Sequence, residues 1–114
     1  MNAVLVGVSG SNNAYSLSLY NLKAYAYQYS EIQDCWDISV IQHPLIGDWR
    51  KDELLSDLAN EIVDRKPSLV GFSCYMWNIQ GFLEIASELS SRLPNARILL
   101  GGPEISREYV QQSY

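Results

Sequence analysis

Residues 69–102 read LVGFSCYMWNIQGFLEIASELSSRLPNARILLGG, and this stretch decides the fold. It opens with the apolar run Leu69–Phe72 and closes with a second run, Ile98–Leu100, before two glycines. Between the runs an apolar stripe recurs at helical spacing, made of Phe82, Ile85, Ala86, Leu89 and Leu93. Short, fully apolar runs are typical of strands buried on both faces. The stretch therefore predicts a strand–helix–strand unit with two parallel strands.

The residues before this unit repeat the same alternation. Residues 3–8 form a third apolar run, and a helical pattern follows from Tyr15 to about Tyr29. Residues 35–41 alternate apolar and polar side chains, which favours a strand at the sheet edge that ends before His43-Pro44. A second helix follows Asp48, a plausible N-cap, and ends before Pro67. A last helix is expected to begin near Glu104.

This order of elements predicts an α/β fold, a flavodoxin-like (Rossmann-like) doubly wound parallel sheet in three layers, α/β/α. The polar edge strand and the apolar central strands fit the order 2-1-3-4-5. The fifth strand of that order is not found in the sequence, and an apolar fourth strand would then be an exposed edge. We therefore expect residues 1–114 to be the N-terminal fragment of a longer chain. This fragment could self-associate through its fourth strand.

The composition excludes several classes of protein. A net charge of −5 with only eight basic residues argues against nucleic-acid binding. No apolar run approaches the roughly 20 residues of a membrane span, and no positively charged signal sequence precedes the first strand. We expect a cytoplasmic protein in which Cys35 and Cys74 are reduced and at least half-buried.

The carboxyl ends of the strands are where such a fold binds ligands. After the first strand, residues 9–13 (SGSNN) could cradle a phosphate or could simply be a capped turn. After the third, residues 73–78 (SCYMWN) place large apolar side chains where the chain meets solvent. They indicate a pocket for a flat ligand, or a cover for the sheet end or for another domain. After the fourth, Gly101-Gly102-Pro103 allows a ligand to approach the backbone, or makes a tight turn.

Two of these segments carry a family resemblance. The residues 70–78 (VGFSCYMWN) and 98–106 (ILLGGPEIS) resemble the cobalamin-binding domains that precede the catalytic barrel in radical-SAM enzymes, over about residues 66–107. The resemblance implies that Ser73 hydrogen-bonds the dimethylbenzimidazole tail and that Gly101 and Gly102 line its slot. A bulky side chain at Gly102 is expected to fill that slot without disturbing the fold. Tyr75 and Trp77 would border the corrin or the partner domain. The full set of expected cofactor contacts is Ser9, Gly10, Ser11, Asn12, Ser73, Cys74, Tyr75, Trp77, Gly101, Gly102, Pro103 and Glu104.

One departure from related families concerns the cobalt ligand. Cobalamin domains of methionine synthase and the mutases carry Asp-x-His-x-x-Gly after the first strand, whereas residues 9–14 here read SGSNNA. The sole histidine, His43, follows the edge strand and is expected to be a surface residue. We therefore expect cobalamin to be held without a histidine ligand, and expect no metal ligand from this chain.

The resemblance also bears on the enzyme as a whole. No Cys-x-x-x-Cys-x-x-Cys motif occurs here, so no catalytic residue is expected in this chain. The [4Fe-4S] cluster and S-adenosylmethionine would belong to a downstream radical-SAM barrel, in an enzyme of methyl transfer or cyclisation. Two alternatives stay open: a flavin mononucleotide domain with residues 9–13 on the phosphate, and a degenerate domain that serves only assembly.

Overall fold

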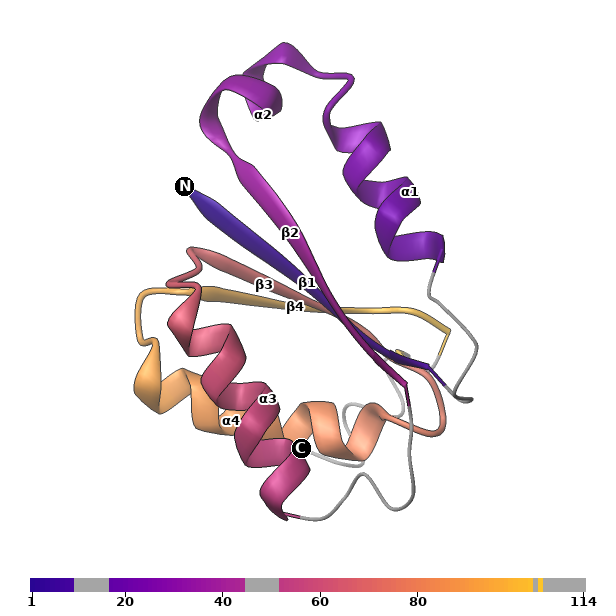
Figure 1. Ribbon diagram of the computed structural model, residues 1–114, viewed down its shortest axis with the longest axis vertical. Helices are drawn as coiled ribbons and strands as arrows, with labels where there is room; N and C mark the ends of the chain where they lie inside the picture. Colours follow the sequence, from indigo (N-terminus) through magenta and orange to yellow (C-terminus); the bar gives the residue numbers. More distant parts are fainter. Residues whose placement is uncertain (10–16, 45–51, 104, 106–114) are drawn as a thin grey trace.

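The computed structural model describes residues 1–9, 17–44, 52–103 and 105. Within them the chain alternates strands and helices (Figure 1). The elements are β1 (Asn2–Ser9), α1 (Leu17–Ala26), α2 (Ser30–Cys35), β2 (Asp37–Pro44), α3 (Asp52–Asp64), β3 (Leu69–Ser73), α4 (Ile79–Arg92) and β4 (Arg97–Gly101).

The strands form one sheet in the order β2-β1-β3-β4, and each neighbouring pair is parallel. This confirms the predicted flavodoxin-like α/β fold, with the half-polar strand β2 at one edge. The ladders differ in length. β1 pairs with β2 as far as Ser9↔Pro44, but β1 pairs with β3 only from Ala3↔Leu69 to Val6↔Phe72. The ends of β1 and β3 are therefore not joined by backbone pairing, although these strands are neighbours.

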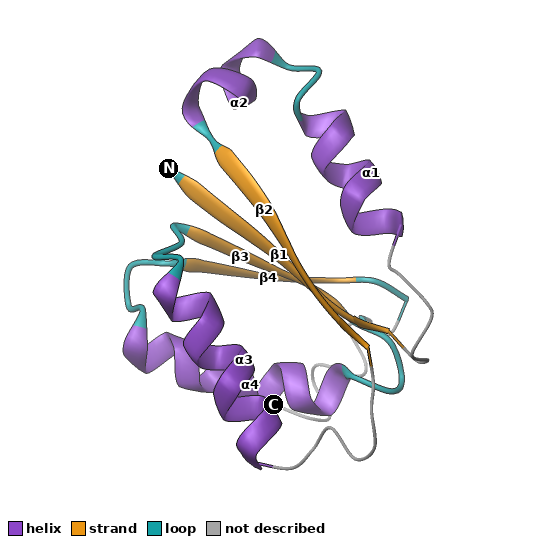
Figure 2. Cartoon of the chain, viewed as in Figure 1, coloured by secondary structure: helices purple, strands orange, loops and turns teal. Residues whose placement is uncertain are grey.

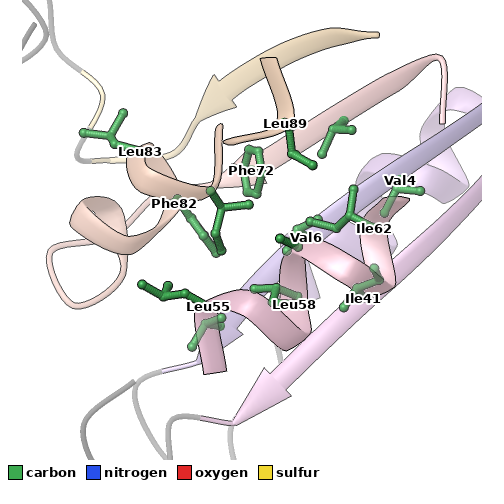
Figure 3. Close-up of a cluster of buried hydrophobic side chains, with 14 of the residues drawn as sticks. Val4, Val6, Ile41, Leu55, Leu58, Ile62, Phe72, Phe82, Leu83 and Leu89 are labelled. Atoms are coloured by element: carbon green, nitrogen blue, oxygen red, sulfur yellow. The ribbon is translucent and has the colours of Figure 1, made fainter. Parts of the chain in front are cut away.

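Helices α3 and α4 cover one face of the sheet, and α1 and α2 lie on the other (Figure 2). The packed core lies on the α3/α4 face (Figure 3), where alternate side chains of β1, namely Val4, Val6 and Val8, meet the apolar stripes of both helices. Phe72 and Phe82 lie at its centre with ring centroids 4.9 Å apart. Burial of these apolar side chains is the main stabilising contribution to the fold.

The opposite face of the sheet is much less completely packed. Leu19 of α1 and Ile38 of β2 are buried there, whereas Leu5 in the central strand is only half-buried. Leu99 of β4, which lies on this same face, is 57% exposed. The sheet therefore has one closed face and one open face, and the open part lies over β3 and β4.

Three details differ from the sequence-based predictions. Helix α2 was not expected, and Cys35 is its last residue instead of the first of strand β2. Cys35 is also exposed, so the expectation of a half-buried thiol was wrong for this residue, although Cys74 is buried. Strand β2 continues through His43 to Pro44. A proline is tolerated at the end of an edge strand because its missing N–H breaks no interior ladder.

Several predicted features fall outside the described residues. They are the loop from Gly10 to Asn13, the N-cap at Asp48, and the helix expected to begin near Glu104. Within the described ranges, no helix combines the length and the apolar character needed to cross a membrane.

Candidate cofactor-binding site

The open face of the sheet carries a hollow of about 600 Å³ between the strands and helices α1 and α2. Its volume lies in the range typical of small-molecule and cofactor sites, roughly 300–1,000 Å³. The sheet contributes mainly the odd-numbered residues of its central strands, and α1 contributes its inner side. The lining includes Leu5, Ser18, Gly71, Ser73, Tyr75, Leu99, Gly101 and Gly102.

The walls of the hollow are uncharged and mainly apolar. None of the described residues that line the hollow is charged, and most are aliphatic. Polar groups come from the hydroxyls of Ser18, Ser73 and Tyr75 and from the glycine backbone at the end of β4. The described walls offer no cationic side chain to a phosphate, although Ser18 lies in the first turn of α1. The hollow therefore suits a mainly apolar group that makes a few hydrogen bonds better than it suits a phosphate.

Two glycines leave space at the centre and at the rim of the hollow. A Cβ added at Gly71 would lie 3.0 Å from Leu5 Cδ2, so a side chain there would crowd the central strand. A Cβ at Gly101 would meet only the Phe72 carbonyl oxygen, at 4.0 Å. Gly101 therefore leaves open space in the hollow.

Gly102 lines the hollow and also has a structural role that was not predicted. Its φ is +101°, a conformation that L residues rarely adopt, and an added Cβ would lie 2.5 Å from the Cys74 carbonyl oxygen and 2.8 Å from the Cys74 nitrogen. The Cys74 N–H meanwhile donates to the Gly101 carbonyl at 2.7 Å. The turn after β4 is thus packed against the turn after β3, and Gly102 is required by that contact. The expectation that a side chain at Gly102 would leave the fold intact is therefore wrong.

The loop after β3 directs its side chains to different places. Ser73 and Tyr75 line the hollow, whereas the Cys74 side chain is fully buried in the α3/α4 core. The Trp77 ring stacks on Tyr75, with ring centroids 4.6 Å apart and ring planes 9° from parallel. Its Nε1–H donates to the Val8 carbonyl at 2.8 Å. The structure therefore brings Ser73, Tyr75, Gly101 and Gly102 together, with Trp77 behind Tyr75.

Burial raises the pKa of the Cys74 thiol to about 11, against a smaller opposing effect of its hydrogen bond with Gly101. At neutral pH this thiol is protonated and inert, since the thiolate is the nucleophile and metal ligand.

We expect iodoacetamide at pH 8 to alkylate Cys35 rapidly and Cys74 only after unfolding, as measured by mass spectrometry. Equal labelling of the two cysteines in the folded protein would contradict this assignment.

Asn78 was not among the expected cofactor contacts, yet its side chain makes hydrogen bonds with three backbone groups of this region. It is 1% exposed, and its amide donates to the carbonyls of Val8 at 3.1 Å and Ser73 at 3.2 Å. Its Oδ1 accepts the Tyr75 N–H at 2.8 Å. The only sequence signal was an asparagine between a strand end and an apolar helix, where N-cap residues are common.

Two other predicted contacts are described but do not line the hollow: Pro103 is exposed, and Ser9 is the last residue of β1. Gly10, Ser11, Asn12 and Glu104 are outside the described residues.

The sole histidine lies on the other side of the sheet. His43 Nε2 is 3.0 Å from Glu61 Oε2 of α3, and Arg65 is 3.2 Å from Glu61 Oε1. These partly exposed groups form a surface ion pair network, which contributes little to stability. His43 therefore faces α3 and not the hollow, in agreement with its assignment as a surface residue.

Comparison with known proteins relates the chain to cobalamin-binding proteins. The family model described as the B12 binding domain matches residues 3–113. Over 51 residues the chain is 31% identical to the cobalamin-dependent radical SAM methyltransferase TokK of Streptomyces tokunonensis, a match that covers 45% of this chain and 7% of that protein. The chain thus spans a small part of the length of this relative. Because the family model covers nearly the whole sequence, the chain belongs to the B12 binding domain family.

Proposed function

We propose that this chain holds cobalamin at the carboxyl ends of its strands, with the dimethylbenzimidazole tail in the hollow on the open face of the sheet. One observation carries the proposal: the hollow brings Ser73, Tyr75, Gly101 and Gly102 together on uncharged walls, in a chain of the B12 binding domain family. When bound, the corrinoid supplies the reactive cobalt, while residues of this chain bind and orient it.

The described residues suit an aromatic tail in three respects. Gly71 and Gly101 leave the sheet surface flat, because neither carries a side chain. Tyr75 offers an aromatic ring at the end of the hollow, and aromatic rings favour stacked or edge contacts with flat groups. Ser73, 9% exposed, offers a hydroxyl that can donate a hydrogen bond to the unprotonated ring nitrogen of the tail.

The test compares cobalamin with cobinamide, which has the corrin ring but lacks the nucleotide tail. It is best made with the longest natural chain that carries residues 1–114. If the tail occupies the hollow, cobalamin should bind at least tenfold more tightly, about 1.4 kcal/mol, as measured by absorption titration. Equal affinities would contradict the placement of the tail. A purified protein that carries yellow flavin would favour the flavin mononucleotide alternative, which the family match does not support.

Replacing Ser73 with Ala should weaken cobalamin binding by about 1 kcal/mol, or roughly fivefold, because one hydrogen bond is lost. The affinity for cobinamide should not change. The same titration measures both values, and an unchanged cobalamin affinity would show that Ser73 does not contact the tail.

We further propose that no histidine of this chain binds cobalt. The support is that His43 is the single histidine of the sequence and faces Glu61 on the α3 side of the sheet. Replacing His43 with Ala should leave the absorption spectrum of the bound cobalamin unchanged. A shift of that spectrum would show that the histidine reaches the cofactor.

Finally, we propose that these residues form the cobalamin-binding part of a larger radical-SAM enzyme. In it a downstream barrel would bind the [4Fe-4S] cluster and S-adenosylmethionine. The support is the short match to a much longer radical SAM methyltransferase and the 57% exposure of Leu99 on edge strand β4. A fifth strand beside β4 would pair its outer backbone groups. The DNA downstream of the codon for Tyr114 tests this: Cys-x-x-x-Cys-x-x-Cys in the same reading frame supports it, and a stop codon contradicts it.

A further inference from the structure

The carboxyl ends of β1 and β3 are joined by side chains and not by the sheet ladder. Pairing of β1 with β3 ends at Val6↔Phe72, whereas β1–β2 pairing continues to Ser9↔Pro44 and β3–β4 pairing to Ser73↔Gly101. The gap lies at the switch point of the strand order, where such folds form their ligand crevice. The Val8 carbonyl lies beyond the last pair, and it accepts hydrogen bonds from Trp77 Nε1 at 2.8 Å and Asn78 Nδ2 at 3.1 Å.

The same two residues fix Tyr75. Asn78 Oδ1 accepts the Tyr75 N–H at 2.8 Å, which holds the backbone of Tyr75. The indole of Trp77 stacks on the Tyr75 ring at 4.6 Å, which holds the side chain. Both residues are bonded to Val8, 69 and 70 positions away in the sequence. Tyr75 is thereby fixed to the end of β1, across the crevice.

Trp77 and Tyr75 differ in what they can contact. Tyr75 lines the hollow, whereas Trp77 and Asn78 do not belong to its lining. Among the contacts described for Trp77, the one with a residue of the lining is its stacking on Tyr75, which can carry an effect of Trp77 to a group inside the hollow.

We propose that Trp77 and Asn78 are positioning residues that hold Tyr75 as a fixed aromatic wall of the hollow. The tail then meets a surface that is already ordered, and little conformational freedom is lost on binding. This inference rests on the proposed function, because it takes the cobalamin tail as the group that meets Tyr75.

The test uses Trp77→Ala and Tyr75→Leu with cobalamin and cobinamide as the two probes, in the longest natural chain that carries residues 1–114. We expect Trp77→Ala to weaken cobalamin binding about tenfold, the size of one lost aromatic contact, and cobinamide binding by less than about twofold. Tyr75→Leu should give the same pattern. The double variant should be no weaker than Tyr75→Leu alone, because both changes remove one contact. Met76→Ala is the matched control: Met76 lies between Tyr75 and Trp77 in the sequence and is 78% exposed, so both affinities should stay unchanged.

A more conservative substitution of Trp77 controls for general damage to the fold. Trp77→Phe keeps a flat ring but removes the N–H that binds Val8, so it should weaken cobalamin binding by about threefold, and cobinamide binding not at all. Equal losses for the two probes in the Trp77 variants, or additive losses in the double variant, would overturn the positioning role. The wild-type protein separates the two proposals: if it does not discriminate cobalamin from cobinamide, the proposed function itself fails.

Discussion

Gly101→Leu should abolish the preference for cobalamin while the protein keeps its fold. A Cβ at this position meets only the Phe72 carbonyl, at 4.0 Å, and the rest of the side chain extends over the face that carries the hollow. Because the tail and the leucine would compete for one space, we expect cobalamin affinity to fall about 100-fold, or about 2.7 kcal/mol. The measurements are absorption titration for affinity and thermal unfolding for stability.

Two comparison variants make this result specific. Arg97→Leu adds a leucine to the same strand outside the hollow, and it should leave the affinity unchanged. Gly102→Leu should instead destabilise the protein, by on the order of 2–4 kcal/mol, because it combines a positive φ with a clash against the Cys74 backbone. An affinity of Gly101→Leu within threefold of the wild type would show that the tail lies elsewhere.

Asn78→Leu should be the most destabilising single substitution in the loop after β3. The leucine fills a similar volume but removes the hydrogen bonds of Asn78 with the Ser73 carbonyl and the Tyr75 N–H, while the Val8 carbonyl keeps Trp77 Nε1 as a partner. Each backbone group that loses its partner costs about 1–3 kcal/mol, so we expect the free energy of unfolding to fall by at least about 2 kcal/mol.

Urea unfolding monitored by circular dichroism measures this loss. Asn60→Leu is the control, because Asn60 is an exposed asparagine on α3, and its substitution should change the free energy of unfolding by less than about 0.5 kcal/mol. A loss below about 1 kcal/mol for Asn78→Leu would mean that these hydrogen bonds do not hold the ends of β1 and β3 together.

The sheet was predictable from sequence because each of its strands carries its own signal. The apolar runs of β1, β3 and β4 and the alternation in β2 suffice to order the strands once parallel crossovers are assumed. Helix α2 was missed because Ser30–Cys35 has no buried residue and hence no apolar stripe. The exposure of Cys35 follows from the same error, since the residue was assigned to the following strand.

The site was predictable only in part, because its geometry depends on packing between segments distant in sequence. Ser73, Tyr75 and Gly101 were identified from the strand ends and do line one hollow. Gly102 was expected in the lining and lies there, but its contact with Cys74 depends on how the turns after β3 and β4 approach each other. Asn78 binds Val8 only because β1 and β3 stop pairing after Val6 and Phe72, and no local pattern encodes that divergence.

The placement of the dimethylbenzimidazole tail in the hollow is tested most directly by the electron paramagnetic resonance spectrum of cob(II)alamin bound to the wild-type protein. If the dimethylbenzimidazole tail lies in the hollow and His43 stays with Glu61, no nitrogen coordinates the lower face of cobalt. We therefore expect a spectrum without nitrogen hyperfine splitting. Clear nitrogen splitting would contradict it, because either the tail or a histidine would then be bound to the metal.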